Sequence, residues 1–324
     1  MRNRPTISVI IPTFDRARYI TNAINSVLSQ SFQDFEIIVV DDGSTDNTKE
    51  VIRNFYPQVK YIYQDNSGVG AARNTGILAS RGEWIAFLDS DDEWMTDYLK
   101  YQMEQACRFP EFIMFVTNSF QISVDGNRID SFEDLHNGLY EKLKEKHLLI
   151  IKKPLIFIIK YHITILETII MKREALIKTG LLNEKLTIAE DLDIIARMAL
   201  QGPLVITDTP LVHIFRRNEN IDNLTKQLFH YSSYDAFFQV YNNLLIKNKF
   251  LKYREKFLLK KKISSNRRAY ANYLLELGKK REARQFFREA LVIYPSLKSL
   301  SKFLISFFSP KIALYFIKHR LKNV

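Results

Sequence analysis

The fold of this chain is decided by a short stretch that reads Trp84-Ile85-Ala86-Phe87-Leu88-Asp89-Ser90-Asp91-Asp92. An unbroken apolar run of this length is typical of a strand buried on both faces of a sheet. Three carboxylates follow within four residues, and clustered carboxylates repel one another unless a cation offsets them. Because residues two apart in extended chain project to the same side, Asp89 and Asp91 are expected to share one ligand. The position after a buried strand favours a site for Mg²⁺ or Mn²⁺ over a solvated acidic turn.

The residues before this stretch repeat an alternation of strand and helix. Apolar runs with buried-strand character predict strands at 7–11, 35–40, 59–63 and 84–88. Helical spacing between them predicts helices over 19–28, from about 46, and over 70–80. This order predicts an α/β fold with a mostly parallel sheet covered by helices. Ligands bind beyond the carboxyl ends of such strands, which points to residues 12–16, 41–44 and 89–92.

Two further segments in this region carry polar groups suited to a nucleotide. The turn Asp41-Asp42-Gly43-Ser44 offers carboxylates that can accept hydrogen bonds from ribose hydroxyls or a base N–H. The same residues are also a common way to cap a helix. Residues 66–76 are rich in glycine and contain Arg73, a fixed fork of donors for phosphate or a base carbonyl. The segment matches neither a Walker loop nor a dinucleotide fingerprint, so the sequence does not support an ATP-binding or NAD-binding site.

Glu190 and Asp191 stand at the start of a helix predicted over about 190–200. Acidic residues in a first helical turn are favoured by the helix dipole, which is their structural explanation. The functional explanation makes Asp191 a general base, since an Asp side chain is ordinarily ionised at neutral pH.

The composition narrows the class of protein. A hydrophobic share of 46% over 324 residues supplies a packed core, and the single cysteine, Cys107, rules out an intrachain disulfide. The first residues do not follow the pattern of a signal peptide, and no run of 18 apolar residues predicts a membrane span. We therefore predict a cytoplasmic protein.

Charge divides the chain into two predicted domains, residues 1–220 and residues 221–324. The first carries a net charge of −5 and the second +16. The second reads as helical throughout, and residues 270–295 resemble one tetratricopeptide unit, although an ordinary helical hairpin fits equally. Apolar and aromatic residues lie on both sides of Pro310 from Phe303 to Ile317, and the residues that flank them are Lys302, Lys311, Lys318, Arg320 and Lys322. This tail predicts docking on an anionic membrane surface, with packing against the preceding helices as the alternative.

Taken in order, the motifs resemble the large family 2 of inverting glycosyltransferases. The matching segments are Val9-Ile10-Ile11-Pro12-Thr13-Phe14, Val39-Val40-Asp41-Asp42-Gly43-Ser44-Thr45-Asp46, Ala72-Arg73-Asn74-Thr75-Gly76, Gly82 to Asp92, and Glu190-Asp191-Leu192-Asp193. The resemblance covers about residues 5–220 and implies the GT-A fold. It implies a nucleotide-diphosphate sugar donor, with UDP as the default, and a saccharide or lipid-linked saccharide as acceptor.

The resemblance also implies roles for particular residues. Those expected around the nucleotide are Pro12, Thr13, Phe14, Asp41, Asp42, Arg73, Asp89 and Ser90. Asp91, with Asp89, is expected to hold Mn²⁺ or Mg²⁺, and Asp191, with Glu190 beside it, to be the catalytic base. Two positions depart from the family pattern. Phe14-Asp15 stands where Tyr-Asn is frequent, and Asn218 stands where a metal-binding His is frequent, so no third ligand is carried over to Asn218 or to nearby His213.

The implied reaction is one in-line displacement in cell-surface polysaccharide or glycolipid synthesis. Arg73, with Arg216 or Arg217, would help to neutralise the leaving diphosphate. Three other functions fit parts of the sequence: a glycoside hydrolase, a non-catalytic sugar-nucleotide-binding protein, and a nucleic-acid-binding protein acting through the basic C-terminal region. That region carries no recognised nucleic-acid motif, and no nucleic-acid partner is predicted.

Overall fold

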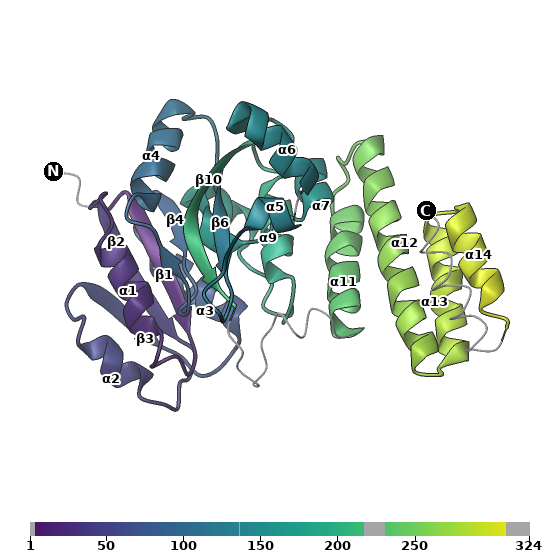
Figure 1. The fold of residues 1–324 in the computed structure, drawn as a ribbon, viewed down its shortest axis with the longest axis horizontal. Coiled ribbons are helices and arrows are strands. Elements are labelled where there is room, and N and C mark those ends of the chain that lie inside the picture. The colour runs from purple at the N-terminus through teal and green to yellow at the C-terminus, as the bar shows by residue number, and fades with distance from the viewer. Residues whose placement is uncertain (1–3, 136, 217–230, 309–324) are drawn as a thin grey trace. The chain divides into compact units, whose positions relative to one another are not determined.

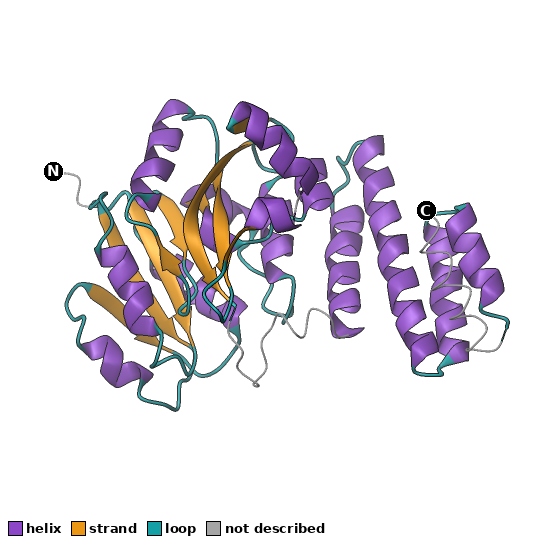
Figure 2. Ribbon diagram, in the orientation of Figure 1, coloured by secondary structure: helices purple, strands orange, loops and turns teal. Residues whose placement is uncertain are grey.

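The computed structural model describes residues 4–135, 137–216 and 231–308. The chain separates into two compact units, Met1–Asn218 and Glu219–Val324. The first unit combines a central sheet with helices, whereas the described part of the second contains helices and no strand (Figures 1 and 2). The predicted architecture, an α/β unit followed by a helical region, is confirmed.

The first unit is built on a sheet that has ten strands within the described residues. Its order is β3-β2-β1-β4-β9-β6-β10-β5, with β7 paired to β6 and β8 paired to β10. The strands are β1 (Ile7–Thr13), β2 (Phe35–Asp41), β3 (Val59–Tyr63), β4 (Trp84–Phe87), β5 (Glu93–Trp94), β6 (Met114–Ile122), β7 (Arg128–Asp130), β8 (Leu148–Ile151), β9 (Ile169–Lys172) and β10 (Leu204–Phe215). The four strands from β3 to β4 are parallel, so their carboxyl ends meet at one edge.

Helices cover both faces of this sheet (Figure 2). They are α1 (Ile20–Leu28), α2 (Thr48–Arg53), α3 (Val69–Ala79), α4 (Tyr98–Arg108), α5 (Ser131–Leu135), α6 (Asn137–Lys146), α7 (Leu155–Tyr161), α8 (Arg173–Thr179) and α9 (Glu190–Met198). A short 3₁₀ turn, Leu166–Thr168, precedes β9. The elements predicted over the first 100 residues and at 173–179 and 190–200 are all present, with ends shifted by a few residues.

The alternation of side chains along β2 shows why the sheet is buried on both faces. Ile37 and Val39 belong to the core cluster that includes Ile24 of α1, whereas Ile38 and Val40 pack with Ala72 of α3. The helix α3 also lies close over β1, because a Cβ at Gly76 would stand 2.4 Å from Cγ2 of Ile10. Only glycine leaves room for that approach, which places the first turns of α3 beside the carboxyl edge of the sheet.

The second half of the sheet is mixed. The strand β9 runs antiparallel to both β4 and β6, and β10 runs parallel to β6. This region, from about residue 114 to 215, is where the sequence pattern is least regular. Its strands come from chain segments far apart in sequence, so local periodicity does not show which of them are neighbours.

The second unit consists, in its described part, of α11 (Tyr231–Lys247), α12 (Tyr253–Glu276), α13 (Lys280–Ile293) and α14 (Leu297–Ile305). The turn between α12 and α13 uses Gly278 at φ 74°. The hairpin that α12 and α13 form around this turn encloses a small core of Ala271, Leu274, Leu275, Ala283 and Phe287. This is the segment that resembles a tetratricopeptide unit.

The predicted membrane tail is only partly within the described residues. Phe303 and Ile305 pack against the hairpin core, as the alternative explanation of their apolar character expects. Residues 309–324, with Pro310 and the basic residues near the end, lie outside the described part. None of the helices described is both long enough and apolar enough to span a bilayer.

Candidate active site

The carboxyl ends of β1 and β2 bring the first predicted nucleotide residues together. Pro12 and Thr13 are buried at the end of β1, and the backbone N–H of Asp42 donates to the carbonyl oxygen of Thr13 at 2.9 Å. Among the described residues, the buried hydroxyl of Thr13 has no hydrogen-bond partner. The ring of Phe14 beside it is 43% exposed. A buried hydroxyl without a partner is costly, so this position favours a ligand that completes it.

Asp41 and Asp42 are buried and fully engaged with the protein. The Asp41 carboxylate accepts from the N–H of Ser44 at 2.9 Å and from the hydroxyl of Tyr61 at 2.7 Å. The Asp42 carboxylate accepts three hydrogen bonds from the segment that leads into α3. Their donors are Nε2 of Gln64 at 2.7 Å, N–H of Ser67 at 3.0 Å and N–H of Gly68 at 2.8 Å. Both carboxylates therefore shape the loops of the site, although neither caps α2, whose N-cap residue is Asn47.

The acidic segment after β4 closes into a turn instead of staying extended. The N–H of Asp92 donates to the carbonyl oxygen of Asp89 at 3.1 Å, which brings the side chain of Asp92 next to that of Asp89. The expectation that extended chain would make Asp89 and Asp91 converge is therefore wrong in its geometry. Asp91 lies 4.0 Å from Nε of Arg16, while Ser90 is buried.

Three carboxylates form a cluster that could hold a metal ion. Oxygens of Asp89, Asp92 and Glu167 all lie within 4.8 Å of one another. Burial and the charges of Asp91 and Asp89 raise the pKa of Asp92 well above its usual range. Burial, the Asp89 charge and a hydrogen bond to Asp89 do the same to the pKa of Glu167. A divalent cation would relieve this repulsion, and oxygen ligands of this kind suit Mn²⁺ or Mg²⁺.

Glu167 belongs to this cluster although its sequence context did not identify it. It lies in the 3₁₀ turn before β9, and β9 pairs with β4, so the pairing carries Glu167 to the end of β4. An isolated acid between Leu166 and Thr168 shows no motif. Only the pairing of β4 with β9 reveals it.

Arg73 ties the acidic cluster to the predicted catalytic pair. The residue is 4% exposed, and its guanidinium donates to Asp89 at 2.8 Å and to Glu190 at 2.8 Å. Burial disfavours the charged guanidinium, but attraction to Asp89 and Glu190 outweighs burial and raises the pKa of Arg73. Burial alone would raise the pKa of Asp89. The positive charge of Arg73 and the hydrogen bonds that Asp89 forms with Glu167 and Arg73 outweigh burial, so the pKa of Asp89 is lowered. Arg73 thus stays charged between two acidic groups.

The predicted base lies at the start of α9. The helix begins after Ala189, which has a φ of 64°, and the N–H of Leu192 donates to Oδ1 of Asp191 at 2.6 Å. Burial and the neighbouring charge of Glu190 raise the pKa of Asp191 to about 8. The expectation that Asp191 is readily ionised at neutral pH is therefore not met in the ligand-free protein.

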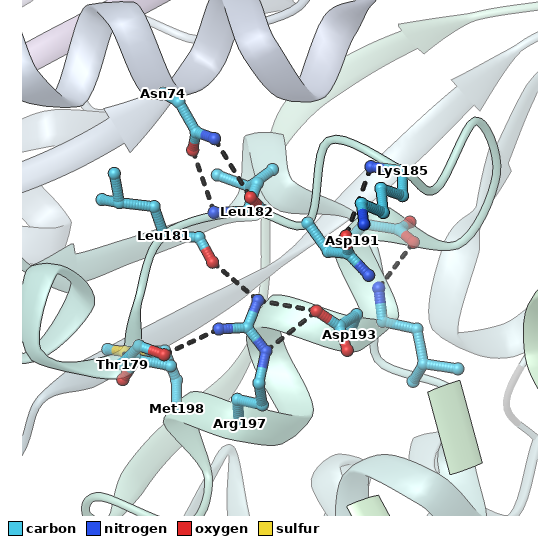
Figure 3. A network of polar contacts seen from close by, with 11 residues as sticks. Asn74, Thr179, Leu181, Leu182, Lys185, Asp191, Asp193, Arg197 and Met198 are labelled. Atoms are coloured by element: carbon cyan, nitrogen blue, oxygen red, sulfur yellow. Dashed lines mark hydrogen bonds and ion pairs between the residues drawn. The ribbon is translucent and has the colours of Figure 1, made fainter. Parts of the chain in front are cut away.

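A polar network ties α9 to α3 and to the segment that precedes α9 (Figure 3). Asn74, the neighbour of Arg73 in α3, exchanges hydrogen bonds with the backbone of Leu182 at 3.0 and 2.9 Å. Nε and Nη2 of Arg197 both donate to Oδ2 of Asp193, at 2.8 and 2.6 Å, and the guanidinium also donates to the carbonyls of Thr179 and Leu181. The segment 179–182, in which Leu181 has a φ of 60°, is therefore held from both α3 and α9.

The residues near the end of β10 complete the site as far as the structure describes it. The N–H of Phe215 donates to Asp92 at 2.9 Å, and Arg216 contributes a positive charge that lowers the pKa of Asp92 slightly against the larger opposing effects. His213 is half-buried near the rings of Phe120 and Phe215, and its buried Nε2 has no hydrogen-bond partner among the described residues. Arg217 and Asn218 lie outside the described residues.

Sequence comparison places this geometry in a known family. The model of glycosyl transferase family 2 matches residues 8–177. The chain belongs to this family. The match includes the turns after β1, β2 and β4 together with Arg73 and Glu167, so it covers the acidic cluster, whereas Glu190 and Asp191 lie beyond it.

Curated relatives match parts of the chain. An uncharacterised glycosyltransferase of Nostoc sp. is 49% identical over 102 residues, which is 30% of this chain and 32% of that protein. A putative teichuronic acid biosynthesis glycosyltransferase, TuaG of Bacillus subtilis, is 35% identical over 137 residues, 40% of this chain and 52% of the relative. Chondroitin synthase of Escherichia coli is 32% identical over 134 residues, 40% of this chain and 20% of the relative. The chain thus matches only about a fifth to a half of each relative's length.

Solved structures share the fold over almost the whole chain. TarS of S. aureus in complex with UDP-GlcNAc superposes with a TM-score of 0.68 at 17% identity, covering 97% of this chain and 92% of TarS. The mannosyltransferase PcManGT of Pyrobaculum calidifontis in complex with GDP-Man and Mn²⁺ gives 0.58 at 19% identity, covering 99% and 88%. At these identities the likeness concerns the fold.

Proposed function

We propose that this glycosyltransferase moves a sugar from a nucleotide-diphosphate donor, UDP by default, to an acceptor hydroxyl with inversion at the anomeric carbon. The observation that carries the proposal is the Arg73 bridge. One buried guanidinium joins Asp89, in the acidic cluster, to Glu190, the neighbour of Asp191. A cationic group and a base held together beside clustered carboxylates suit a reaction in which a diphosphate leaves as a hydroxyl is deprotonated.

The donor would lie across the carboxyl ends of β1, β2 and β4. The buried hydroxyl of Thr13 and Nε of Arg73 both lack partners among the described residues and could bind polar groups of the donor. The exposed ring of Phe14 offers a flat apolar face to the nucleotide base. Asp41 and Asp42 would act by holding the loops that shape this surface, and Ser90 by its place in the turn.

A divalent cation fits the donor set of this site. Asp89 and Asp91 remain the proposed ligands by family pattern, and the cluster adds Asp92 and Glu167 as carboxylates within reach of Asp89. When bound, Mn²⁺ or Mg²⁺ would supply positive charge against which the diphosphate leaves. Burial and repulsion within the cluster raise the pKa of Asp92 and of Glu167, and this repulsion supports the proposal of a cation there.

Asp191 is the proposed base. Its carboxylate takes the proton of the acceptor hydroxyl, the acceptor oxygen forms a bond to the anomeric carbon, and the bond from that carbon to the diphosphate breaks. The nucleoside diphosphate leaves with the electron pair from the opposite face, and Arg73 helps to stabilise its charge. An α-linked donor gives a β-linked product. Glu190 orients this step through its hydrogen bond with Arg73.

The names of relatives and neighbours support a proposal for the class of sugar and acceptor. Their names include teichuronic acid biosynthesis and chondroitin synthesis, and the neighbours of similar fold include complexes with UDP-GlcNAc and GDP-Man. We infer a hexosyl- or N-acetylhexosaminyltransferase that builds a cell-surface polysaccharide or glycolipid on the cytoplasmic side of the membrane. The acceptor would be a saccharide or a lipid-linked saccharide.

The test has two stages. Sugar nucleotides are screened with Mn²⁺ for thermal stabilisation, since a ligand at 100 times its Kd stabilises by about 2.7 kcal/mol. The stabilising donor is then incubated with saccharide acceptors, and the product is analysed by mass spectrometry and by NMR of the anomeric proton. Stabilisation without transfer to any acceptor would favour a non-catalytic binding protein. Donor cleavage to free sugar as the sole reaction would favour a hydrolase.

A further inference from the structure

Two loops of the helical unit lie at the same end of its helices. One joins α11 to α12 and the other joins α13 to α14, and both stand at the top of the unit in Figure 1. A ring contact links them, because the centroids of Phe257 and Tyr294 are 5.3 Å apart. We call this end, residues 246–257 and 292–298, the basic tip.

The basic tip exposes large apolar side chains. Phe250 is 98% exposed, Leu297 87% and Tyr253 85%. Three more apolar side chains that are more than 40% exposed lie in the same two segments: Ile246, Phe257 and Val292. Single exposed apolar residues are ordinary on a protein surface, but six in two adjoining segments mark an interaction site. They require a partner that offers apolar volume.

Basic residues lie in the same two segments as these apolar side chains. They are Lys247, Lys249, Lys252, Arg254, Lys256 and Lys298. The single acidic residue of the tip, Glu255, accepts a hydrogen bond from the backbone N–H of Lys252 at 2.7 Å and so caps α12. The cations therefore have little compensation within the tip.

The uncompensated charge continues from the tip along α14. Burial and the positive charges of Lys298 and Arg268 lower the pKa of Lys302 to about 8. Arg268 itself donates to the hydroxyls of Ser264 and Ser299 at 2.7 and 2.8 Å, which are neutral groups. Cations that crowd one another in this way are stabilised by an anionic surface.

We propose that the basic tip docks on an anionic lipid bilayer, with Phe250 and Tyr253 inserted at the depth of the headgroups. Aromatic rings and lysines whose stems lie along apolar surface are the side chains that bind this interface. Nucleic acid is a poorer match, because the exposed aliphatic groups of Ile246, Val292 and Leu297 offer nothing to stack on bases. The proposal does not depend on the transferase reaction.

The basic tip is distinct from the tail that the sequence suggests. The helix α14 leads from the tip toward the opposite end of the unit, where Nζ of Lys280, the first residue of α13, donates to the carbonyl of Phe307 at 2.9 Å. Leu304 and Phe308 lie in that part and are 53% and 54% exposed. The two surfaces can therefore be tested separately with matched substitutions.

The experiment is flotation of the full chain with vesicles of phosphatidylcholine, with or without phosphatidylglycerol. The apolar variant is Phe250→Ala with Tyr253→Ala, and its control is Leu304→Ala with Phe308→Ala. The charge variant carries Lys249→Gln, Arg254→Gln and Lys256→Gln. Its control, with the same change in net charge, carries Lys279→Gln, Arg281→Gln and Arg288→Gln.

The wild-type chain is expected to float with anionic vesicles and to stay unbound with phosphatidylcholine alone. The charge variant should lose about a hundredfold in partition coefficient, about fivefold for each basic residue near the surface. The apolar variant should lose about tenfold. Both controls should bind within about twofold of wild type, and thermal melting of each variant establishes that the side chains changed are not needed for folding.

Three results would overturn the proposal. The first is equal binding to neutral and anionic vesicles. The second is loss of binding in the controls with retention in the tip variants, which would assign the membrane contact to the tail. The third is absence of vesicle binding by the wild type together with a salt-sensitive shift of an oligonucleotide. Donor turnover measured without vesicles tests the proposed reaction independently.

Discussion

Two acidic turns at the same edge of the sheet, Asp41-Asp42 after β2 and Asp89 to Asp92 after β4, look alike in sequence and differ in structure. In the first, both carboxylates accept hydrogen bonds from nearby protein groups, among them the N–H of Gly68 at 2.8 Å. In the second, Asp92 lies against Asp89 and Glu167, and repulsion and burial raise its pKa.

The difference teaches that a pair of carboxylates after a buried strand has no fixed role. A carboxylate surrounded by N–H donors stabilises the loop that carries them, whereas a carboxylate facing others is stabilised by a cation from outside. The first turn builds the site and the second holds the unsatisfied charge. The following predictions test this division.

The largest effect on the rate is expected at Asp191, the proposed base. Its neighbour Glu190 is linked to the second turn through Arg73. Asp191→Asn should lower kcat by about 10²–10⁴-fold, because the variant cannot take the acceptor proton. Donor affinity should stay within a few fold of wild type, since the substitution leaves the acidic cluster intact. The measurement is single-turnover transfer together with donor titration. Transfer near the wild-type rate would show that another group is the base.

The next effect separates the two turns by their response to metal. Asp91→Ala should weaken donor binding in Mn²⁺ by about 10–100-fold and remove the difference between Mn²⁺ and EDTA. Asp41→Asn, the matched change in the first turn, should keep that difference. Calorimetric titration of the donor with Mn²⁺ or EDTA measures both. An unchanged metal response in the Asp91 variant would exclude it as a ligand.

Stability should change in opposite directions in the two turns. Asp42→Asn should cost about 1–3 kcal/mol, because an amide can replace only part of the acceptors that bind Gln64, Ser67 and Gly68. Asp92→Asn should not destabilise the metal-free protein at pH 7. The folded protein raises the pKa of Asp92, so its ionised form opposes folding above the unfolded-state pKa. The amide removes that opposition and can still accept from Phe215.

Urea denaturation of the two variants, with and without Mn²⁺, measures this contrast. Asp92→Asn should also lose most of the stabilisation that Mn²⁺ gives to the wild type, whereas Asp42→Asn should retain it. A loss of several kcal/mol in the metal-free Asp92 variant would mean that this carboxylate is structural, like those of the first turn.

The last prediction concerns the pH dependence of the wild-type enzyme. Because the pKa of Asp191 is raised to about 8, the ionised base becomes scarcer as the pH falls below that value. kcat/KM should therefore rise about tenfold per pH unit below about 8 and level off above it. The pH profile of kcat/KM in a buffer series from pH 6 to 9.5 measures this. A profile that is flat from pH 6 to 8 would show that Asp191 is already ionised before the donor binds.

Much of the first unit could be predicted from the sequence because its order is local. The strands β1 to β4 and the helices between them follow one another along the chain, and each carries its own period and its own turn. The mixed half of the sheet could not be derived in this way. Its neighbours, such as β4 with β9, lie far apart in sequence, and no local pattern records their pairing.

The residues of the candidate site also fall into two groups, those that a local sequence pattern identifies and those that only contacts between distant segments reveal. The sequence by itself determined which polar residues stand at the ends of its elements, since Thr13, Asp41, Asp89 and Asp191 all lie where strand or helix patterns begin or end. Only the tertiary structure decided that Asp92 and Glu167 join Asp89, and that burial beside Glu190 raises the pKa of Asp191. Residue types and their periods are properties of neighbours along the chain. Distances between distant carboxylates, and the water that folding removes around them, exist only after the sheet has closed.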